Sequence, residues 1–153
     1  MFVNKGKIVV IGTSNVGSAV VNKIADFQLA SEIALIDLNT DKAKGEALDS
    51  SHATSCIYST NIDIHLGTYE DCKDAGIIVI TAGPSIRPGE TPDRLRLAAT
   101  NSKIMHSVFS EIVKYTKEAM VIMITNPLDV ATYCVSTQFD YPREKILGTG
   151  TLL

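Results

Sequence analysis

The feature that most constrains the fold is an alternation along the chain between short, almost wholly apolar runs and longer stretches of helical period. This alternation is typical of a parallel sheet with helices on both faces, because parallel strands need crossover connections and are buried on both sides. The sequence therefore predicts an α/β fold, a doubly wound parallel sheet that forms one domain over residues 1–153. Strands are expected at 7–11, 32–37, 61–66, 76–81 and 119–124.

The third of these strands differs from the others because apolar and polar residues alternate along it. Ile62 and Ile64 point to one side, and Asp63 and His65 point to the other. One wet face indicates a strand at an edge of the sheet.

Helices are expected between the strands, and two of them carry apolar stripes that should face the core. These stripes comprise Val16, Val20, Ile24 and Phe27, and then Leu97, Ile104, Val108, Ile112 and Tyr115. A further helix is expected over 41–55 and a single helical turn over 67–75. The last helix is expected to begin at Pro127 with Asn126 as its cap, because proline favours the first helical position.

Composition limits the class of partner. The 14 basic and 17 acidic residues give a net charge of -3 without a basic block, which disfavours nucleic-acid binding. The apolar runs are far shorter than the roughly 20 residues that span a bilayer, so we expect no membrane segment and a cytoplasmic location. The three cysteines form no C-x-x-C pair, and His52, His65 and His106 lack metal-ligand spacing, so we expect neither disulfides nor a metal site. A small molecule is the expected partner.

A glycine-containing loop lies between the first strand and the first helix. It reads Gly12-Thr13-Ser14-Asn15-Val16-Gly17. Backbone N–H groups at such a helix start bind the pyrophosphate of a dinucleotide. Ser14 replaces the usual middle glycine, and its hydroxyl can donate to a phosphate oxygen. Taken alone, this loop fits a tight turn without a ligand equally well.

A carboxylate at the end of the second strand strengthens the prediction. Asp37 follows Gly17 by twenty residues, where a carboxylate accepts hydrogen bonds from the adenosine ribose. Leu38 and Asn39 come next, so no arginine stands beside Asp37 to receive a 2'-phosphate, which Asp37 would also repel. The pair of features predicts NAD, and not NADP, as the cofactor. A turn or capping aspartate is the alternative.

Two further loops are expected at the carboxyl edge of the sheet, where doubly wound folds bind ligands. Thr81-Ala82-Gly83-Pro84 opens a loop that runs to Arg94 with three prolines and two glycines, a composition suited to a hinged lid. Arg87, Arg94 and Arg96 offer cations for an anionic substrate, although each also fits an ordinary surface charge. Asn126, which follows the last predicted strand, can bond a substrate carbonyl or hydroxyl, or cap a helix.

Seven motifs follow one another in a fixed order along the chain. They are Gly12 to Gly17, Ile36-Asp37, Gly45-Glu46-Ala47-Leu48-Asp49, Thr81-Ala82-Gly83, Arg87-Pro88-Gly89-Glu90-Thr91, Thr125-Asn126-Pro127-Leu128-Asp129-Val130 and Gly148-Thr149-Gly150-Thr151. Together they resemble the L-lactate/malate dehydrogenase family over nearly the whole chain, and residues 93–153 are most similar to its L-lactate and L-2-hydroxyisocaproate branch. The resemblance implies a Rossmann-type NAD-binding domain of an oxidoreductase that transfers a hydride between NAD and a 2-hydroxy acid.

The resemblance also implies roles for individual residues. In the family, the positions of Val16 and Asp37 hold the adenosine half of the cofactor, and those of Asn126 and Thr149 approach the nicotinamide and the substrate. The predicted cofactor-binding residues are Gly12, Ser14, Asn15, Val16, Gly17, Asp37, Thr81, Ala82, Gly83, Pro84, Asn126 and Thr149. The predicted substrate-binding residues are Ile86, Arg87, Arg94 and Asn126.

Arg94 is the predicted catalytic arginine, which would polarise the substrate carbonyl. The family places this arginine directly after Gly-Glu-Thr, where Pro92 stands here, and counting back seven residues from Asn101 places it at Arg94. Arg87 and Arg96 are the alternatives. The proton-shuttling histidine, its partner aspartate and the arginine that clamps the substrate carboxylate are expected in a C-terminal catalytic domain after Leu153, so we expect this chain alone to be inactive.

The substrate side chain stays open between three choices. The family's specificity position falls on Ile86, with Arg87 beside it. Ile86 favours lactate or a bulkier 2-oxo acid such as that of L-2-hydroxyisocaproate, because a second carboxylate would be unpaired against it. An inward Arg87 would favour malate. A non-enzymatic NAD-binding sensor domain, or another Rossmann enzyme such as an NAD-dependent glycosidase, are the alternatives in other classes. The resemblance also implies a homo-oligomer, with the helix that carries Gly45 to Asp49 packed against another subunit.

Overall fold

A computed structural model of the chain describes residues 6–55, 61–84 and 93–150. The elements in chain order are β1 (Lys7–Ile11), α1 (Asn15–Asp26), β2 (Glu32–Ile36), α2 (Thr40–Thr54), β3 (Asp63–Leu66), η1 (Tyr69–Lys73), β4 (Ala75–Ile80), α3 (Arg94–Tyr115), β5 (Met120–Met123), α4 (Leu128–Gln138), η2 (Arg143–Lys145) and β6 (Ile146–Gly148). All five predicted strands are confirmed to within two residues at each end.

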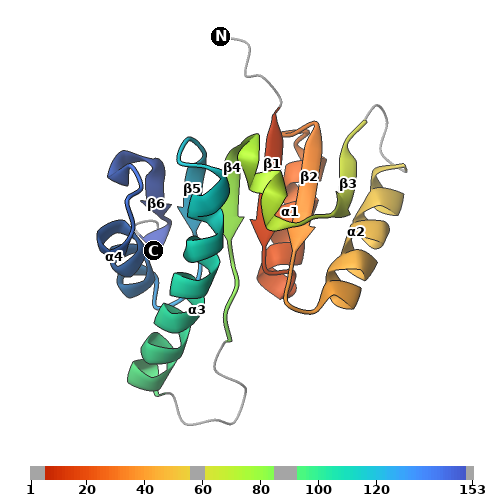
Figure 1. Cartoon of the computed structure of the whole chain (residues 1–153). Helices are drawn as coiled ribbons and strands as arrows, with labels where there is room; N and C mark the ends of the chain where they lie inside the picture. Colours follow the sequence, from red (N-terminus) through yellow and green to blue (C-terminus); the bar gives the residue numbers. More distant parts are fainter. Residues whose placement is uncertain (1–5, 56–60, 85–92, 151–153) are drawn as a thin grey trace.

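The strands form one parallel sheet in the order β3-β2-β1-β4-β5-β6 (Figure 1). The chain starts in the middle at β1, moves outward to β3, and then returns to β4 on the other side of β1. The doubly wound topology is therefore confirmed. Its order reverses between β1 and β4, and in such sheets the ligand crevice lies beyond the carboxyl ends of the strands at this point.

Helices cover both faces of the sheet and form two cores (Figure 1). Val9 and Ile11 of β1 belong to the core that contains Phe109 of α3 and Val135 of α4. The intervening residues of β1 point to the other core, which is packed by α1 and α2. Burial on both faces explains why the central strands are apolar without alternation. The edge position predicted for the third strand is also confirmed, because β3 ends the sheet.

Three predictions about the helices were wrong. Val16 and Phe27 were assigned to a core stripe but are 49% and 68% exposed, because Val16 lies in the first turn and Phe27 caps the end of α1. The buried residues of α1 are Gly17, Val21, Ile24 and Ala25, so the predicted burial of Ile24 is confirmed. On α3, Tyr115 ends the helix and is 40% exposed.

The start of α4 also differs from the prediction. The helix begins at Leu128, and Pro127 occupies the N-cap position with no side-chain capping bond, so Asn126 is not the cap. The peptide bond between Asn126 and Pro127 is cis. The strand β6 was not predicted, because three residues of strand are too short to produce a periodic signal. In the described part of the chain, no helix is long and apolar enough to cross a membrane.

Candidate functional site

Two glycines shape the loop between β1 and α1. Gly12 has a φ of +100°, and a Cβ added to it would lie 2.7 Å from the backbone nitrogen of Ala82. A Cβ on Gly17 would lie 1.9 Å from the carbonyl oxygen of Gly12. Both positions therefore require glycine, which lets the loop pass close to β4 and lets α1 pack closely on the end of β1.

Ser14 occupies the place of the missing middle glycine. It is the exposed N-cap residue of α1, and its side chain makes no capping hydrogen bond. The N–H groups of Asn15 and Val16 have no partner within the helix, and the first turn of α1 contains no acidic residue. This helix start favours an anion through its free N–H groups and its dipole, and the Ser14 hydroxyl adds one more donor.

Asp37 directly follows β2 and is bonded to the glycine loop. Its Oδ2 accepts hydrogen bonds from the backbone N–H of Thr13 at 2.7 Å and from the Thr13 hydroxyl at 3.0 Å, and its Oδ1 accepts from the N–H of Asn39 at 3.0 Å. Partial burial opposes ionisation, but these hydrogen bonds and the charge of Lys42 lower the pKa of Asp37 below its usual value. Asp37 is thus an oriented, ionised acceptor at neutral pH.

Thr13 is a site residue that the sequence analysis missed. It is completely buried and donates both of the bonds that hold Oδ2 of Asp37. The sequence contained a signal for it, because a hydroxyl residue directly after the first glycine must lie at the end of β1, beside the end of β2.

Two buried threonines at the ends of β4 and β5 connect the neighbouring loops. The Thr81 hydroxyl donates to the carbonyl oxygen of Gly12 at 2.9 Å, and the Thr125 hydroxyl donates to that of Ala82 at 2.7 Å. Thr81 was predicted to bind the cofactor, and here its hydroxyl also fixes the glycine loop. These bonds join the three loops into one structure along the carboxyl edge of the sheet.

A cavity of about 940 Å³ opens at this edge. Seven of the predicted cofactor-binding residues line it, namely Ser14, Asn15, Val16, Thr81, Gly83, Pro84 and Asn126. Apolar side chains complete the wall, including Leu97, Ile124, Leu128 and Val130. An apolar wall with a few convergent polar groups suits a ligand that combines phosphates with flat rings. The polar donors of the loop and the volume therefore fit a dinucleotide.

Two of the predicted residues need separate description: Asn126, which lines this cavity, and Thr149, which is not among its lining residues. Asn126 is exposed and directly follows Thr125 at the end of β5. The Thr149 hydroxyl and N–H both donate to the carbonyl oxygen of Met123 at 3.3 Å, so its polar groups are engaged within the fold. Arg94 begins α3, but its side chain lies outside the described part of the structure, as do Ile86 and Arg87 entirely.

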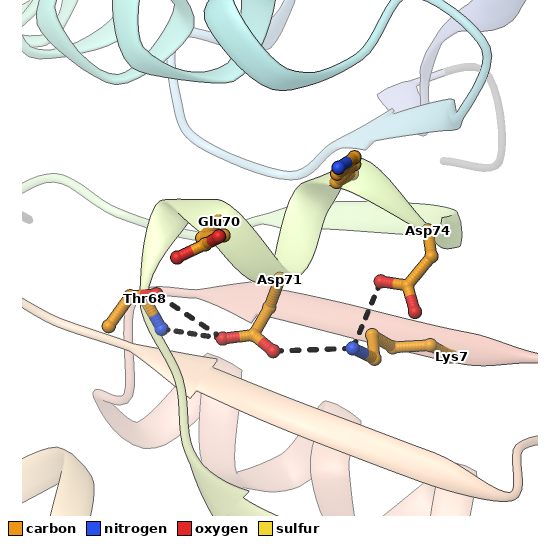
Figure 2. Close-up of a pocket in the computed structure, with 6 residues that line it drawn as sticks. Lys7, Thr68, Glu70, Asp71 and Asp74 are labelled. Carbon is orange, nitrogen blue, oxygen red and sulfur yellow. Dashed lines mark hydrogen bonds and ion pairs between the residues drawn. The ribbon is translucent and has the colours of Figure 1, made fainter.

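A second hollow, of about 570 Å³, lies at the opposite, amino edge of the sheet (Figure 2). The ammonium of Lys7 contacts three carboxylates there, with Nζ 2.9 Å from Glu32, 3.2 Å from Asp71 and 3.0 Å from Asp74. Burial alone would lower the pKa of Lys7, but the hydrogen bonds to these carboxylates raise it well above its usual value.

His65, one of the histidines that lack metal-ligand spacing in the sequence, joins this group. His65 Nε2 lies 3.1 Å from Glu32, and the ligand atoms of His65, Glu32 and Asp71 all lie within 4.8 Å of one another. The Lys7 ammonium contacts both carboxylates, so it already supplies the positive charge that a metal ion would bring. The cluster is organised as an ion-pair network.

A doubly wound parallel sheet, a glycine loop at a helix start and a carboxylate after the second strand together define a dinucleotide-binding domain of the Rossmann class. A family model described as "lactate/malate dehydrogenase, NAD binding domain" matches residues 6–148. The chain belongs to this family.

Individual relatives agree with this assignment. The chain is 83% identical over 150 residues to an L-lactate dehydrogenase of Selenomonas ruminantium, a match that covers 98% of the chain and 47% of the relative. It superposes on the minor L-lactate dehydrogenase of Enterococcus mundtii with a TM-score of 0.88 and 34% identity, over 96% of the chain and 46% of that protein. For a malate dehydrogenase of Archaeoglobus fulgidus in complex with NADH, the TM-score is 0.85 and the sequence identity is 35%. This match covers 94% of the chain and 48% of that protein. The chain thus spans about half the length of these relatives.

Proposed function

We propose that this chain is the NAD-binding half of an L-lactate dehydrogenase. The observation that carries the proposal is the junction of the glycine loop with Asp37, because it places a phosphate-binding helix start and an ionised ribose acceptor on one edge of the sheet. The name of the 83% identical relative supports lactate as the substrate. The cofactor, when bound, supplies the site that accepts or donates the hydride.

The chain's own residues bind and orient the cofactor in this proposal. Asp37 accepts the two hydroxyls of the adenosine ribose, and Thr13 holds the carboxylate in that orientation. The N–H groups at the start of α1 and the Ser14 hydroxyl bind the pyrophosphate. Gly83, Pro84 and Asn126 line the cavity, and in this proposal the first two border the cofactor and Asn126 approaches its nicotinamide.

The residues near the substrate complete the reaction. Arg94 donates to the substrate carbonyl oxygen and stabilises the negative charge that develops on it as the hydride arrives. Ile86, at the family's specificity position, is the proposed contact of the lactate methyl group. The proton is carried by a histidine and aspartate of a C-terminal domain that follows this chain in the full-length enzyme.

The test is a steady-state assay of the full-length protein with NAD and three acids: L-lactate, L-malate and L-2-hydroxyisocaproate. The expected result is the highest kcat/KM for L-lactate. Preference for malate would show that Arg87 and not Ile86 determines the substrate. NAD binding without turnover of any 2-hydroxy acid would identify a sensor and would contradict the proposal.

The same full-length protein is proposed to be a cytoplasmic homo-oligomer, with α2 in the subunit contact. Leu48 on this helix is 58% exposed, and Gly45 has open space around its Cα, so a neighbouring backbone can approach. Size-exclusion chromatography of the full-length protein at high concentration tests the proposed oligomer. A protein that remains a monomer would contradict the proposal.

A further inference from the structure

Asn101 is a buried polar side chain in the middle of an otherwise apolar helix face. It lies on α3, two helical turns after Arg94, and is 1% exposed. Burial of an amide costs free energy unless hydrogen bonds satisfy it, so an asparagine at this place calls for a specific role.

The amide nitrogen of Asn101 connects two loops of the proposed cofactor site. Nδ2 donates to the carbonyl oxygen of Asn126 at 2.5 Å and to that of Pro84 at 3.4 Å. The first carbonyl follows β5 and the second follows β4. One side chain therefore uses both of its N–H groups to fix the two loops relative to each other and to α3.

The amide oxygen faces Gly83. Oδ1 has no hydrogen-bond partner among the described residues, and a Cβ added to Gly83 would lie 2.8 Å from it. Gly83 also has a φ of +140°, which favours glycine. Asn101 and Gly83 thus fit together sterically, and the orientation of the amide is set by its two donors and not by its acceptor.

We propose that Asn101 is a positioning residue for the proposed dehydrogenase reaction. By holding the main chain of Asn126 and Pro84, it aims the Asn126 side chain at the nicotinamide and substrate end of the cavity. It touches neither the substrate nor the reacting atoms. The inference rests on the proposed function for its effect on turnover, but the connection between the loops is independent of the substrate.

The adenosine end of the cavity does not depend on Asn101. Asp37 is held by Thr13 and Asn39, and the glycine loop is held by Thr81. Loss of the Asn101 donors should therefore change turnover much more than the affinity for NAD.

The test compares Asn101→Asp and Asn101→Leu in the full-length enzyme, with Thr132→Val as a control. The aspartate variant keeps the shape but loses both donors while it is ionised, and the leucine variant removes them at every pH. Each variant should lower kcat by about tenfold or more at pH 8, with the NAD dissociation constant changed by less than about threefold. Thr132 is the other residue with a buried side-chain atom that lacks a partner in the described structure, so removing its hydroxyl should leave kcat unchanged.

The pH dependence separates positioning from simple packing. Burial raises the pKa of a carboxyl group, and the protonated carboxyl group in the variant Asn101→Asp can donate again to one carbonyl. The kcat of Asn101→Asp relative to the parent enzyme should therefore recover as the pH falls, while that of Asn101→Leu stays low. If Asn101→Leu fails to fold, Asn101→Asp decides alone, because protonation restores a donor within one protein.

Amide hydrogen exchange gives a readout that needs no turnover. In folded Asn101 variants, exchange should become faster at the amides of Ala82 and Gly83 and of Thr125, Asn126 and Leu128, but not at residues 12–17. Faster exchange at both loops in a protein that does not oxidise lactate would support the positioning role and contradict only the proposed function. Three results would overturn the inference: unchanged amide exchange at both loops, an equal recovery of kcat in Asn101→Asp and Asn101→Leu at low pH, or a loss of kcat in Thr132→Val.

Discussion

The two ends of the parallel sheet both carry polar side chains around a hollow, but they use them in opposite ways. At the amino edge, the Lys7 ammonium pairs with the carboxylates of Glu32, Asp71 and Asp74, and Figure 2 shows Lys7 beside Asp71 and Asp74. At the carboxyl edge, the helix start of α1 and the hydroxyl of Ser14 have no capping partner, and Asp37 keeps lone pairs free after its three bonds.

The difference shows how a ligand site can be recognised in a hollow lined by charge. At the amino edge, paired opposite charges connect β1, β2 and η1. Because these charges already have partners, a ligand that bound to them would gain little free energy. Donors and acceptors that are rigidly held but unpaired have their orientation fixed in advance, so a ligand that pairs with them gains the hydrogen bonds without the ordering cost. The amino edge is therefore structural, and the carboxyl edge is the binding edge.

The largest effect is expected from adding one carbon to a glycine of the binding edge. In Gly17→Ala, the new Cβ would overlap the carbonyl oxygen of Gly12, so α1 must move away from β1. We expect a loss of about 3 kcal/mol in the free energy of unfolding, measured by urea denaturation, together with weaker NAD binding.

Gly76 supplies the matched control. It lies near the start of β4, at the amino edge of the sheet. A Cβ there would meet only the carbonyl oxygen of Lys7, at 3.9 Å. Gly76→Ala should therefore change the free energy of unfolding by no more than about 0.5 kcal/mol. Equal effects at both glycines would remove the structural distinction between the two edges.

The next largest effect is expected from the arginine at the start of α3. In the full-length enzyme, Arg94→Gln should lower kcat on the order of 10²-fold or more and leave NAD affinity nearly unchanged, because only the charge that develops in the transition state loses its partner. Arg96→Gln and Arg87→Gln are the controls, measured by the same assay. Near-normal turnover in Arg94→Gln with loss of activity in either control would show that the catalytic arginine was assigned to the wrong position.

A smaller and purely structural effect is expected at the amino edge. Lys7→Met leaves three carboxylates close together, and we expect a loss of about 2 kcal/mol in unfolding free energy at neutral pH, with no change in NAD affinity. Because the folded pKa of Lys7 is raised, its contribution is complete below the ordinary lysine pKa and disappears only as the pH rises through the folded value.

At acid pH, the carboxylates determine how the difference in unfolding free energy between the parent protein and Lys7→Met depends on pH. Hydrogen bonds from Thr68 and Lys7 outweigh burial and lower the pKa of Asp71, so its contribution is lost as the pH falls through that lowered value. The stability difference between the parent and Lys7→Met should therefore be constant near neutral pH and shrink below about pH 4. A reduced NAD affinity in Lys7→Met would contradict the separation of the two edges.

Much of the fold could be predicted from the sequence because the governing signals are local. Apolar runs identified β1, β2, β4 and β5, and the alternation in residues 61–66 identified the edge strand β3. The three-residue β6 and the exposure of Val16 and Phe27 were missed, since helical spacing places residues on one face but does not say where the helix stops contacting the sheet.

The site divides in the same way. Gly12, Gly17 and Asp37 were predictable, because their spacing follows from the geometry of a strand, a turn and a helix. Thr13, Thr125 and Asn101 act through partners on distant loops, and only the folded chain brings those partners together. The network of Lys7 with Glu32, Asp71 and His65 was missed for the same reason.

The preference for NAD over NADP tests the role of the binding edge most directly. Oδ2 of Asp37 is fixed by Thr13, so the ionised carboxylate cannot turn away from a 2'-phosphate, and the residues that follow it supply no arginine. Isothermal titration of the full-length protein with each cofactor should show NAD bound at least about tenfold more tightly than NADP, as expected for one unfavourable charge contact. Equal or tighter binding of NADP would contradict the assignment of Asp37 as the ribose acceptor.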